Sequence, residues 1–191
     1  MLNLPNILTL SRIMVIPIVV TTFFFDSPEM RWAACALFTA AGITDFFDGY
    51  LARRANKVSA FGRFLDPIAD KLLVAAVLFL IVAFEERLAR WCILPALVIL
   101  LREITISGLR EYLAELRVSV PVTKLAKAKT TVQMVALGFV IVGDAAPWWI
   151  PAKLIGEIGI WFAALITLIT GYDYLKSGIR YMAGNPPPAG S

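Results

Sequence analysis

The chain of 191 residues contains no histidine. This absence excludes metal sites built on imidazole, histidine general bases and a phosphohistidine intermediate. The chain has only two cysteines, Cys35 and Cys92, each within an apolar segment, and they form no metal-binding pattern. We therefore interpret both cysteines as packing residues.

Charged residues are also scarce, at 17%, whereas 59% of the residues are hydrophobic and the mean hydropathy is +0.77. Such a composition is typical of an integral membrane protein. We expect an all-α fold, a bundle of six transmembrane helices in one domain spanning residues 1–183, with a flexible tail at 184–191. The predicted helices are Ile7–Phe25, Trp32–Tyr50, Phe64–Phe84, Trp91–Leu109, Val122–Val142 and Ile155–Tyr174.

The lysines and arginines are unevenly distributed between the two ends of these helices. One set of alternate connections carries four of the 18 basic residues, Arg31, Arg87, Arg90 and Lys153, and the other 14 belong to the opposite side. Basic residues favour the cytoplasmic face of a membrane. We therefore expect both termini on the cytoplasmic side, and the net charge of +4 indicates topology rather than a nucleic-acid partner.

The second and third predicted helices carry an unusual number of carboxylates. Between residues 45 and 71 the chain holds four aspartates, Asp45, Asp48, Asp66 and Asp70. Spacings of three and four residues place each pair on one face of a helix. A carboxylate deep in a bilayer costs roughly 2.5–3.5 kcal/mol, and clustered carboxylates repel one another. A cation must balance them, and oxygen ligands favour magnesium, manganese or calcium over zinc.

The pattern Asp45-x2-Asp48-Gly49-x2-Ala52-Arg53-x8-Gly62-x3-Asp66-x3-Asp70 resembles the signature of the CDP-alcohol phosphatidyltransferase family. The resemblance implies transfer of a phosphatidyl group from CDP-diacylglycerol to an alcohol, with release of CMP, and two divalent metal ions, magnesium or manganese. Asp45, Asp48 and Asp66 would hold one metal, and Asp45, Asp66 and Asp70 the other. Asp70 would also act as the general base. The aspartate site would lie on the cytoplasmic side of the membrane, and family members are commonly homodimers.

The resemblance also implies a site for the CDP-lipid head group. Its expected residues come from the first helix and the aspartate stretch: Thr9, Arg12, Gly49, Ala52, Arg53 and Ser59. Two of them have simpler alternatives. Arg12 is able to extend toward the membrane interface as a snorkelling side chain, and Arg53 can serve as a cytoplasmic anchor.

A further group of cations follows between Leu101 and Met134. An acceptor alcohol that carries a phosphate, such as glycerol 3-phosphate or inositol phosphate, would need them. The runs REITISGLREYLAEL and AKAKTTVQM resemble the branch of the family that uses sn-glycerol 3-phosphate. The alternative is a basic stripe that contacts anionic lipid head groups. The expected phosphate-binding residues are Arg102, Arg110, Lys127, Lys129 and Arg180.

The sequence is also compatible with two other functions. One is the same chemistry with inositol phosphate or phosphatidylglycerol as the acceptor. The other is a small cation transporter that uses the aspartates as an ion path, although a transporter would not need the spacing of Gly49, Ala52 and Arg53.

Overall fold

The computed structural model describes residues 4–55, 60–84, 88–116, 118 and 124–183, and it describes only the backbone at residues 4–6, 45–55, 60–61, 63–64, 66–67, 70, 124 and 127. The described residues are helical, with short connections and no strand. The elements are α1 (Leu4–Phe23), α2 (Pro28–Ala55), α3 (Ala60–Ala83), η1 (Arg90–Cys92), α4 (Ile93–Glu115), α5 (Lys124–Val142), η2 (Gly143–Ala145) and α6 (Ala152–Met182).

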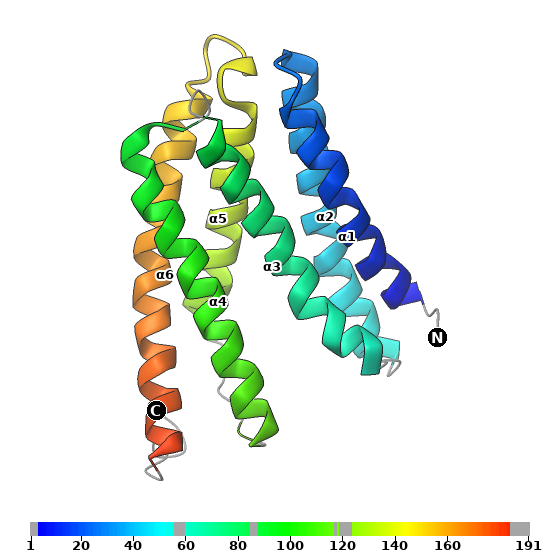
Figure 1. Ribbon diagram of the computed structural model, residues 1–191, viewed down its shortest axis with the longest axis vertical. Coiled ribbons are helices and arrows are strands. Elements are labelled where there is room, and N and C mark those ends of the chain that lie inside the picture. Colours follow the sequence, from blue (N-terminus) through cyan, green and yellow to red (C-terminus); the bar gives the residue numbers. More distant parts are fainter. Residues whose placement is uncertain (1–3, 56–59, 85–87, 117, 119–123, 184–191) are drawn as a thin grey trace.

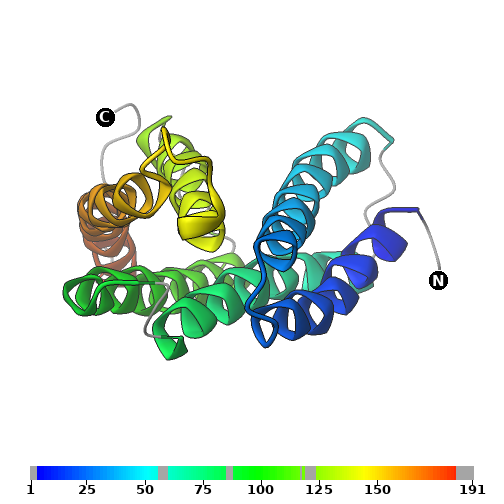
Figure 2. The same ribbon diagram turned by 90° about the horizontal axis from the view of Figure 1, so that it is seen from above.

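The six α-helices form a ring when the molecule is viewed along their length (Figure 2). Neighbours around this ring are α1, α2, α5, α6, α4 and α3, and α3 returns to α1. α1 begins and α6 ends in the lower part of Figure 1, where α2 also ends and α3 begins. We call this the site end, because the aspartate stretch lies there, and we call the opposite end of the bundle the far end.

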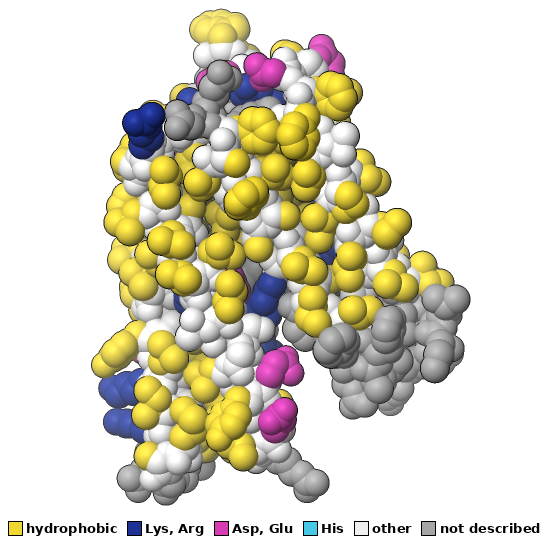
Figure 3. Space-filling view, viewed as in Figure 1, with side chains coloured by type: hydrophobic (Ala, Val, Ile, Leu, Met, Phe, Trp, Pro, Cys, Tyr) yellow, Lys and Arg dark blue, Asp and Glu magenta, His cyan; other side chains and the backbone are white. Residues whose placement is uncertain are grey.

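Each predicted apolar segment forms a helix, as expected from its length and composition. Three helical stretches among the described residues are long and apolar enough to cross a membrane: Arg90–Glu115, Ala128–Ala145 and Ala152–Met182. Ile7–Phe23 and Lys71–Ala83 form shorter apolar helices. Apolar side chains cover most of the face shown in Figure 3, as a surface in contact with lipid requires.

The far end is held together by polar contacts between its connections. Arg31 Nη2 donates to Asp26 Oδ1 at 2.9 Å, and Trp32 Nε1 donates to the carbonyl of Ala145 at 3.1 Å. The backbone N–H of Ala89 donates to Glu157 Oε1 at 3.1 Å. The Trp32 bond ties α2 to the α5–α6 connection, and the Ala89 bond ties α6 to the segment before α4.

Close packing of α5 against α6 depends on small residues. A Cβ atom at Gly156 would lie 2.5 Å from Val140 Cγ2 and 2.8 Å from the backbone nitrogen of Val140, and one at Gly159 would lie 2.7 Å from Ala136 Cβ. Both glycines therefore serve packing within the chain, which is a usual role of small residues in membrane helices.

We expect Gly156→Ala to destabilise the bundle by about 1–3 kcal/mol, because its methyl group meets backbone that cannot rotate away. Thermal unfolding in detergent, followed by circular dichroism, measures this effect. Gly108→Ala is the matched control, since a Cβ at Gly108 meets no atom within 4 Å. Equal unfolding temperatures for the two variants would contradict the packing argument.

Candidate functional site

The aspartates lie on two helices that are consecutive in the chain. Asp45 and Asp48 belong to α2, and Asp66 and Asp70 belong to α3, so the helical spacing assumed from the sequence holds for the backbone. Their side chains lie outside the described residues. The described side chains include no group of three or more acidic or cysteine residues that could hold a metal ion. The four-aspartate site therefore stays a prediction.

The expected CDP-lipid residues of α1 are both buried. Thr9 is 1% exposed and Arg12 is 3% exposed. The helix α1 packs on α2 and α3, the two helices that carry the aspartates. Burial of the arginine argues against the snorkelling alternative, in which its guanidinium would reach the membrane interface. Of the other expected residues, the side chains of Gly49, Ala52 and Arg53, and Ser59 altogether, lie outside the described residues.

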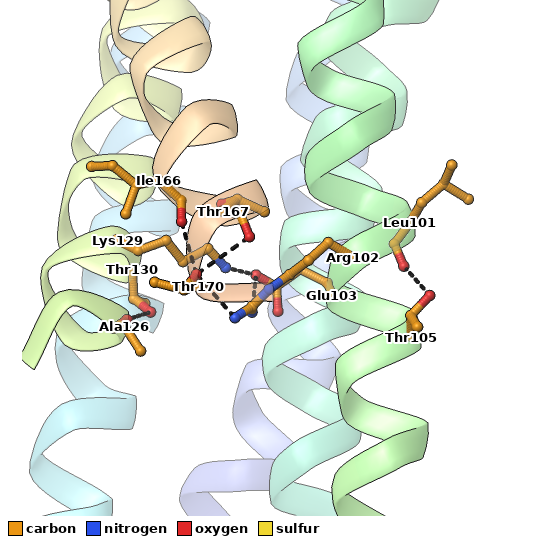
Figure 4. Close-up of polar contacts among 10 residues, drawn as sticks. All are labelled: Leu101, Arg102, Glu103, Thr105, Ala126, Lys129, Thr130, Ile166, Thr167 and Thr170. Carbon is orange, nitrogen blue, oxygen red and sulfur yellow. Dashed lines mark hydrogen bonds and ion pairs between the residues drawn. The ribbon is translucent and has the colours of Figure 1, made fainter. Parts of the chain in front are cut away.

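A cluster of charged and hydroxyl side chains connects α4, α5 and α6 (Figure 4). Lys129 of α5 donates a hydrogen bond to Glu103 Oε1 of α4, and it is only 2% exposed. Arg102 Nη1 lies 3.9 Å from the same carboxylate oxygen, and Arg102 Nη2 donates to Thr170 Oγ1 of α6 at 3.3 Å. We call Arg102, Glu103, Lys129 and Thr170 the buried cation cluster. It contains two positive charges and one negative charge, so an anion would complete it.

Gly171 allows Arg102 to lie against α6. A Cβ atom at this glycine would lie 3.1 Å from Arg102 Cγ and 3.4 Å from Arg102 Nε. The Nε atom is buried and has no hydrogen-bond partner among the described residues. A guanidinium that keeps one donor unused inside a protein is a suitable partner for a phosphate or carboxylate oxygen.

The buried cation cluster also reaches the helix that carries Asp66 and Asp70. Lys71 of α3 and Glu103 of α4 both line a cavity of about 410 Å³ between these two helices. Lys71 directly follows Asp70 in the sequence. The helix that carries Asp66 and Asp70 therefore lies beside the helix that carries Arg102 and Glu103, although Asp70 and Arg102 are 32 positions apart in the sequence.

The other expected phosphate-binding residues are less clearly placed. Arg110 and Arg180 are exposed, and the described structure shows no hydrogen bond or ion pair from either to the buried cation cluster. The side chain of Lys127 lies outside the described residues. Arg102 and Lys129 are thus the two expected cations that the structure brings together, and the assignment of the other three stays a prediction.

The structure adds three polar side chains that sequence reasoning missed. Gln133, Thr167 and Thr170 are all buried. Gln133 lies on α5 and the two threonines lie on α6, and buried polar residues of membrane helices commonly join helices to one another. Their position beside Lys129 and Arg102 depends on how α5 and α6 pack, which no local pattern indicates.

A groove of about 870 Å³ lies between α2 and α5, with mostly apolar walls. On α2 its lining extends from Trp32 at the far end to Ile43, two residues before Asp45, and Thr130 and Met134 are part of its α5 side. An elongated apolar guest would therefore extend along the bundle toward the aspartate stretch.

Comparison with known proteins gives concordant results. A family model described as CDP-alcohol phosphatidyltransferase matches residues 2–169. Proteins named CDP-diacylglycerol–glycerol-3-phosphate 3-phosphatidyltransferase match the chain in Rickettsia bellii, with 49% identity over 94% of this chain and 97% of the relative, and in Shigella flexneri, with 42% identity over 92% and 94%. The corresponding protein of Cereibacter sphaeroides is 38% identical over 94% of this chain and 97% of its own length.

One solved structure has a similar fold. The phosphatidylinositol phosphate synthase of Mycobacterium tuberculosis, crystallised with CDP-DAG bound, aligns with a TM-score of 0.61 and 21% sequence identity. The alignment covers 91% of this chain and 85% of that protein.

Proposed function

Because the chain belongs to the CDP-alcohol phosphatidyltransferase family, we propose that it transfers the phosphatidyl group of CDP-diacylglycerol to sn-glycerol 3-phosphate. The products are phosphatidylglycerophosphate and CMP. The observation that carries this proposal is the match, along nearly the whole chain, to several proteins named for that reaction.

The buried cation cluster supports an acceptor that carries a phosphate. Arg102 and Lys129 are held inside the bundle, where an unbalanced positive charge is costly, and only Glu103 offsets them within the described residues. The phosphate of glycerol 3-phosphate would accept hydrogen bonds from Arg102 Nε and from Lys129. Arg110, Lys127 and Arg180 would add positive charge on the cytoplasmic side of this position.

The aspartates supply the reaction chemistry in this proposal. Asp45, Asp48, Asp66 and Asp70 would hold two divalent ions, magnesium or manganese, because the set consists of oxygen ligands at helical spacings that place each pair on one face. When bound, the ions neutralise the diphosphate of the CDP-lipid and stabilise charge on the departing CMP. Asp70 accepts the proton of the attacking hydroxyl group, and its position beside that hydroxyl contributes more than its basicity.

The CDP-lipid would occupy the side of the site formed by α1 and α2. Thr9 and Arg12 would enclose its head group together with Gly49, Ala52, Arg53 and Ser59. The groove between α2 and α5 suits its acyl chains, because the groove is apolar and approaches Asp45. The lipid would thereby reach the aspartates laterally from the bilayer.

The chain is an integral membrane protein, and we assign all six helices to membrane spans. The site end would face the cytoplasm, since 14 of the 18 lysines and arginines belong to that side. Glycerol 3-phosphate would then enter from the cytoplasm, and a homodimer is the expected assembly.

The proposed function is tested by CMP release from the purified protein in detergent with CDP-diacylglycerol and magnesium. Glycerol 3-phosphate, inositol phosphate, serine and phosphatidylglycerol are offered separately. We expect release with glycerol 3-phosphate alone, loss of release on chelation, and recovery with magnesium or manganese. Release with a different acceptor would support the family chemistry but exclude glycerol 3-phosphate as the acceptor. Metal-independent release would exclude the proposed role of the aspartates as metal ligands.

A further inference from the structure

Two buried polar residues each lie one helical turn from a member of the buried cation cluster, and each has a side-chain oxygen without a hydrogen-bond partner among the described residues. Gln133 is 3% exposed and Thr167 is fully buried. Gln133 Oε1 and Thr167 Oγ1 have no hydrogen-bond partner among the described residues. An unpaired polar atom inside a membrane helix bundle is costly, because no bulk water is available to replace the missing bond.

Gln133 lies on the far-end side of Lys129 along α5, and Thr167 lies on the far-end side of Thr170 along α6. Gln133 follows Lys129 by one turn of α5, so the two side chains share a face. Thr167 precedes Thr170 by one turn of α6, and Thr170 Oγ1 contacts the carbonyl oxygen of Thr167 at 3.3 Å (Figure 4).

The packing of α5 and α6 places Thr167 level with Lys129, four residues along α5 from Gln133. The helices are antiparallel, and Gly159 lies against Ala136. Thr167 follows Gly159 by eight residues on α6, and Lys129 precedes Ala136 by seven residues on α5, which is about two turns in each helix. Thr167 and Lys129 therefore lie at about the same level of the bundle. The side chain of Gln133 leans toward the N-terminus of α5, which is the direction of Lys129.

The chemistry of these atoms differs from that of the cations beside them. The carbonyl oxygen of Gln133 only accepts hydrogen bonds, and the hydroxyl group of Thr167 can donate one. A neutral hydroxyl group satisfies both, since it has one donor and two acceptor positions. A fully ionised phosphate group has no proton to donate to Gln133 Oε1, so it would leave that atom without a hydrogen bond.

We propose that Gln133 and Thr167 bind the secondary hydroxyl group of the acceptor and thereby determine acceptor specificity. The inference rests on the proposed function, in which glycerol 3-phosphate reacts through its primary hydroxyl group. The phosphate is then held by Arg102 and Lys129, the primary hydroxyl group faces Asp70 on α3, and the remaining hydroxyl group meets Gln133 and Thr167.

The test compares two acceptors in each variant. The compound 3-hydroxypropyl phosphate keeps the phosphate and the reacting hydroxyl group of glycerol 3-phosphate but lacks the secondary hydroxyl group. For the unmodified protein we expect kcat/KM to be roughly tenfold to a hundredfold higher with glycerol 3-phosphate, the usual effect of leaving a buried polar group unpaired. In Thr167→Val and in Gln133→Leu this preference should fall to within about threefold, through loss of activity with glycerol 3-phosphate alone.

Two further variants serve as controls. Thr167→Ser retains the hydroxyl group and should retain the preference. Thr105→Val also removes a threonine hydroxyl group, but Thr105 is exposed and its Oγ1 donates to the carbonyl of Leu101 in its own helix at 2.8 Å, so the preference should not change. Because the preference is a ratio within one preparation, it does not depend on how much of a variant is folded. If Thr167→Val yields no protein, Gln133→Leu provides the same comparison.

The outcomes separate this inference from the proposed function. An equal loss with both acceptors would mean that the two residues only join α5 to α6, and it would overturn the inference while the proposed function stands. The absence of any preference between the two acceptors in the unmodified protein would also overturn the inference and leave the proposed function standing. No CMP release from the unmodified protein with either acceptor would reject the proposed function itself and the inference with it.

Discussion

Replacement of Asp70 by asparagine should lower kcat for CMP release by at least about a thousandfold and leave thermal unfolding nearly unchanged. A positioned general base contributes roughly 10²–10⁴ to the rate, and the substitution would also remove one carboxylate oxygen from a metal site. Asparagine has almost the same shape as aspartate, so the packing of α3 should be preserved. Initial rates with glycerol 3-phosphate and an unfolding curve in detergent measure the two quantities.

Two other aspartates provide the comparison for Asp70. Asp144 lies at the far end, exposed to solvent and 3.9 Å from Arg31 Nη1, and Asp144→Asn should retain normal turnover. Asp48 is expected to act only as a metal ligand, so excess magnesium should partly restore Asp48→Asn but not Asp70→Asn. Near-normal turnover in Asp70→Asn would exclude its role as the general base.

The number and order of the helices were predictable because long apolar segments require helices in a bilayer. The ends of the helices were predicted less accurately. α2 begins four residues before the predicted segment and ends five residues after it, and α6 continues to Met182, eight residues beyond the predicted end at Tyr174. Hydropathy marks where a helix leaves the hydrocarbon region, but the helical hydrogen bonds continue past that boundary into charged sequence, such as the stretch of α6 that contains Lys176 and Arg180.

The expected site was predictable only in part. The aspartate pattern is local, so its spacing alone indicates carboxylates on shared helix faces. Arg102 and Arg110 were predicted together because both are cations in the same helix, yet the structure half-buries Arg102 against α6 and leaves Arg110 exposed. Which face of α4 meets α6 depends on side-chain packing between segments far apart in the chain. The same packing between distant segments determines that Lys129 pairs with Glu103, and it determines that Gln133 and Thr167 are buried.

The second large effect is expected at Lys129. Lys129→Met should raise KM for glycerol 3-phosphate roughly tenfold to a hundredfold, because a hydrogen bond to a charged group contributes about 1.5–3 kcal/mol. KM for CDP-diacylglycerol should change by less than about threefold, since the lipid head group is assigned to α1 and α2. Initial rates with each substrate varied in turn measure both constants. An equal rise in both would favour the alternative in which the cations contact lipid head groups.

Substitution of Glu103, the partner of Lys129, separates an effect on acceptor binding from an effect on the stability of the bundle. In Lys129→Met the carboxylate of Glu103 keeps its ion pair with Arg102, at 3.9 Å, but loses its hydrogen bond from Lys129, and the bundle should lose roughly 1–3 kcal/mol of stability. The double variant Lys129→Met/Glu103→Gln should recover most of that stability, because it no longer contains a partly buried carboxylate that has lost its hydrogen bond from Lys129, yet it should keep the raised KM. Lys176→Met is the control, since Lys176 is exposed on α6, with its Nζ 6.0 Å from the ring centre of Tyr172. If the double variant regained a normal KM, Lys129 would act only by balancing Glu103 and would not bind the acceptor phosphate.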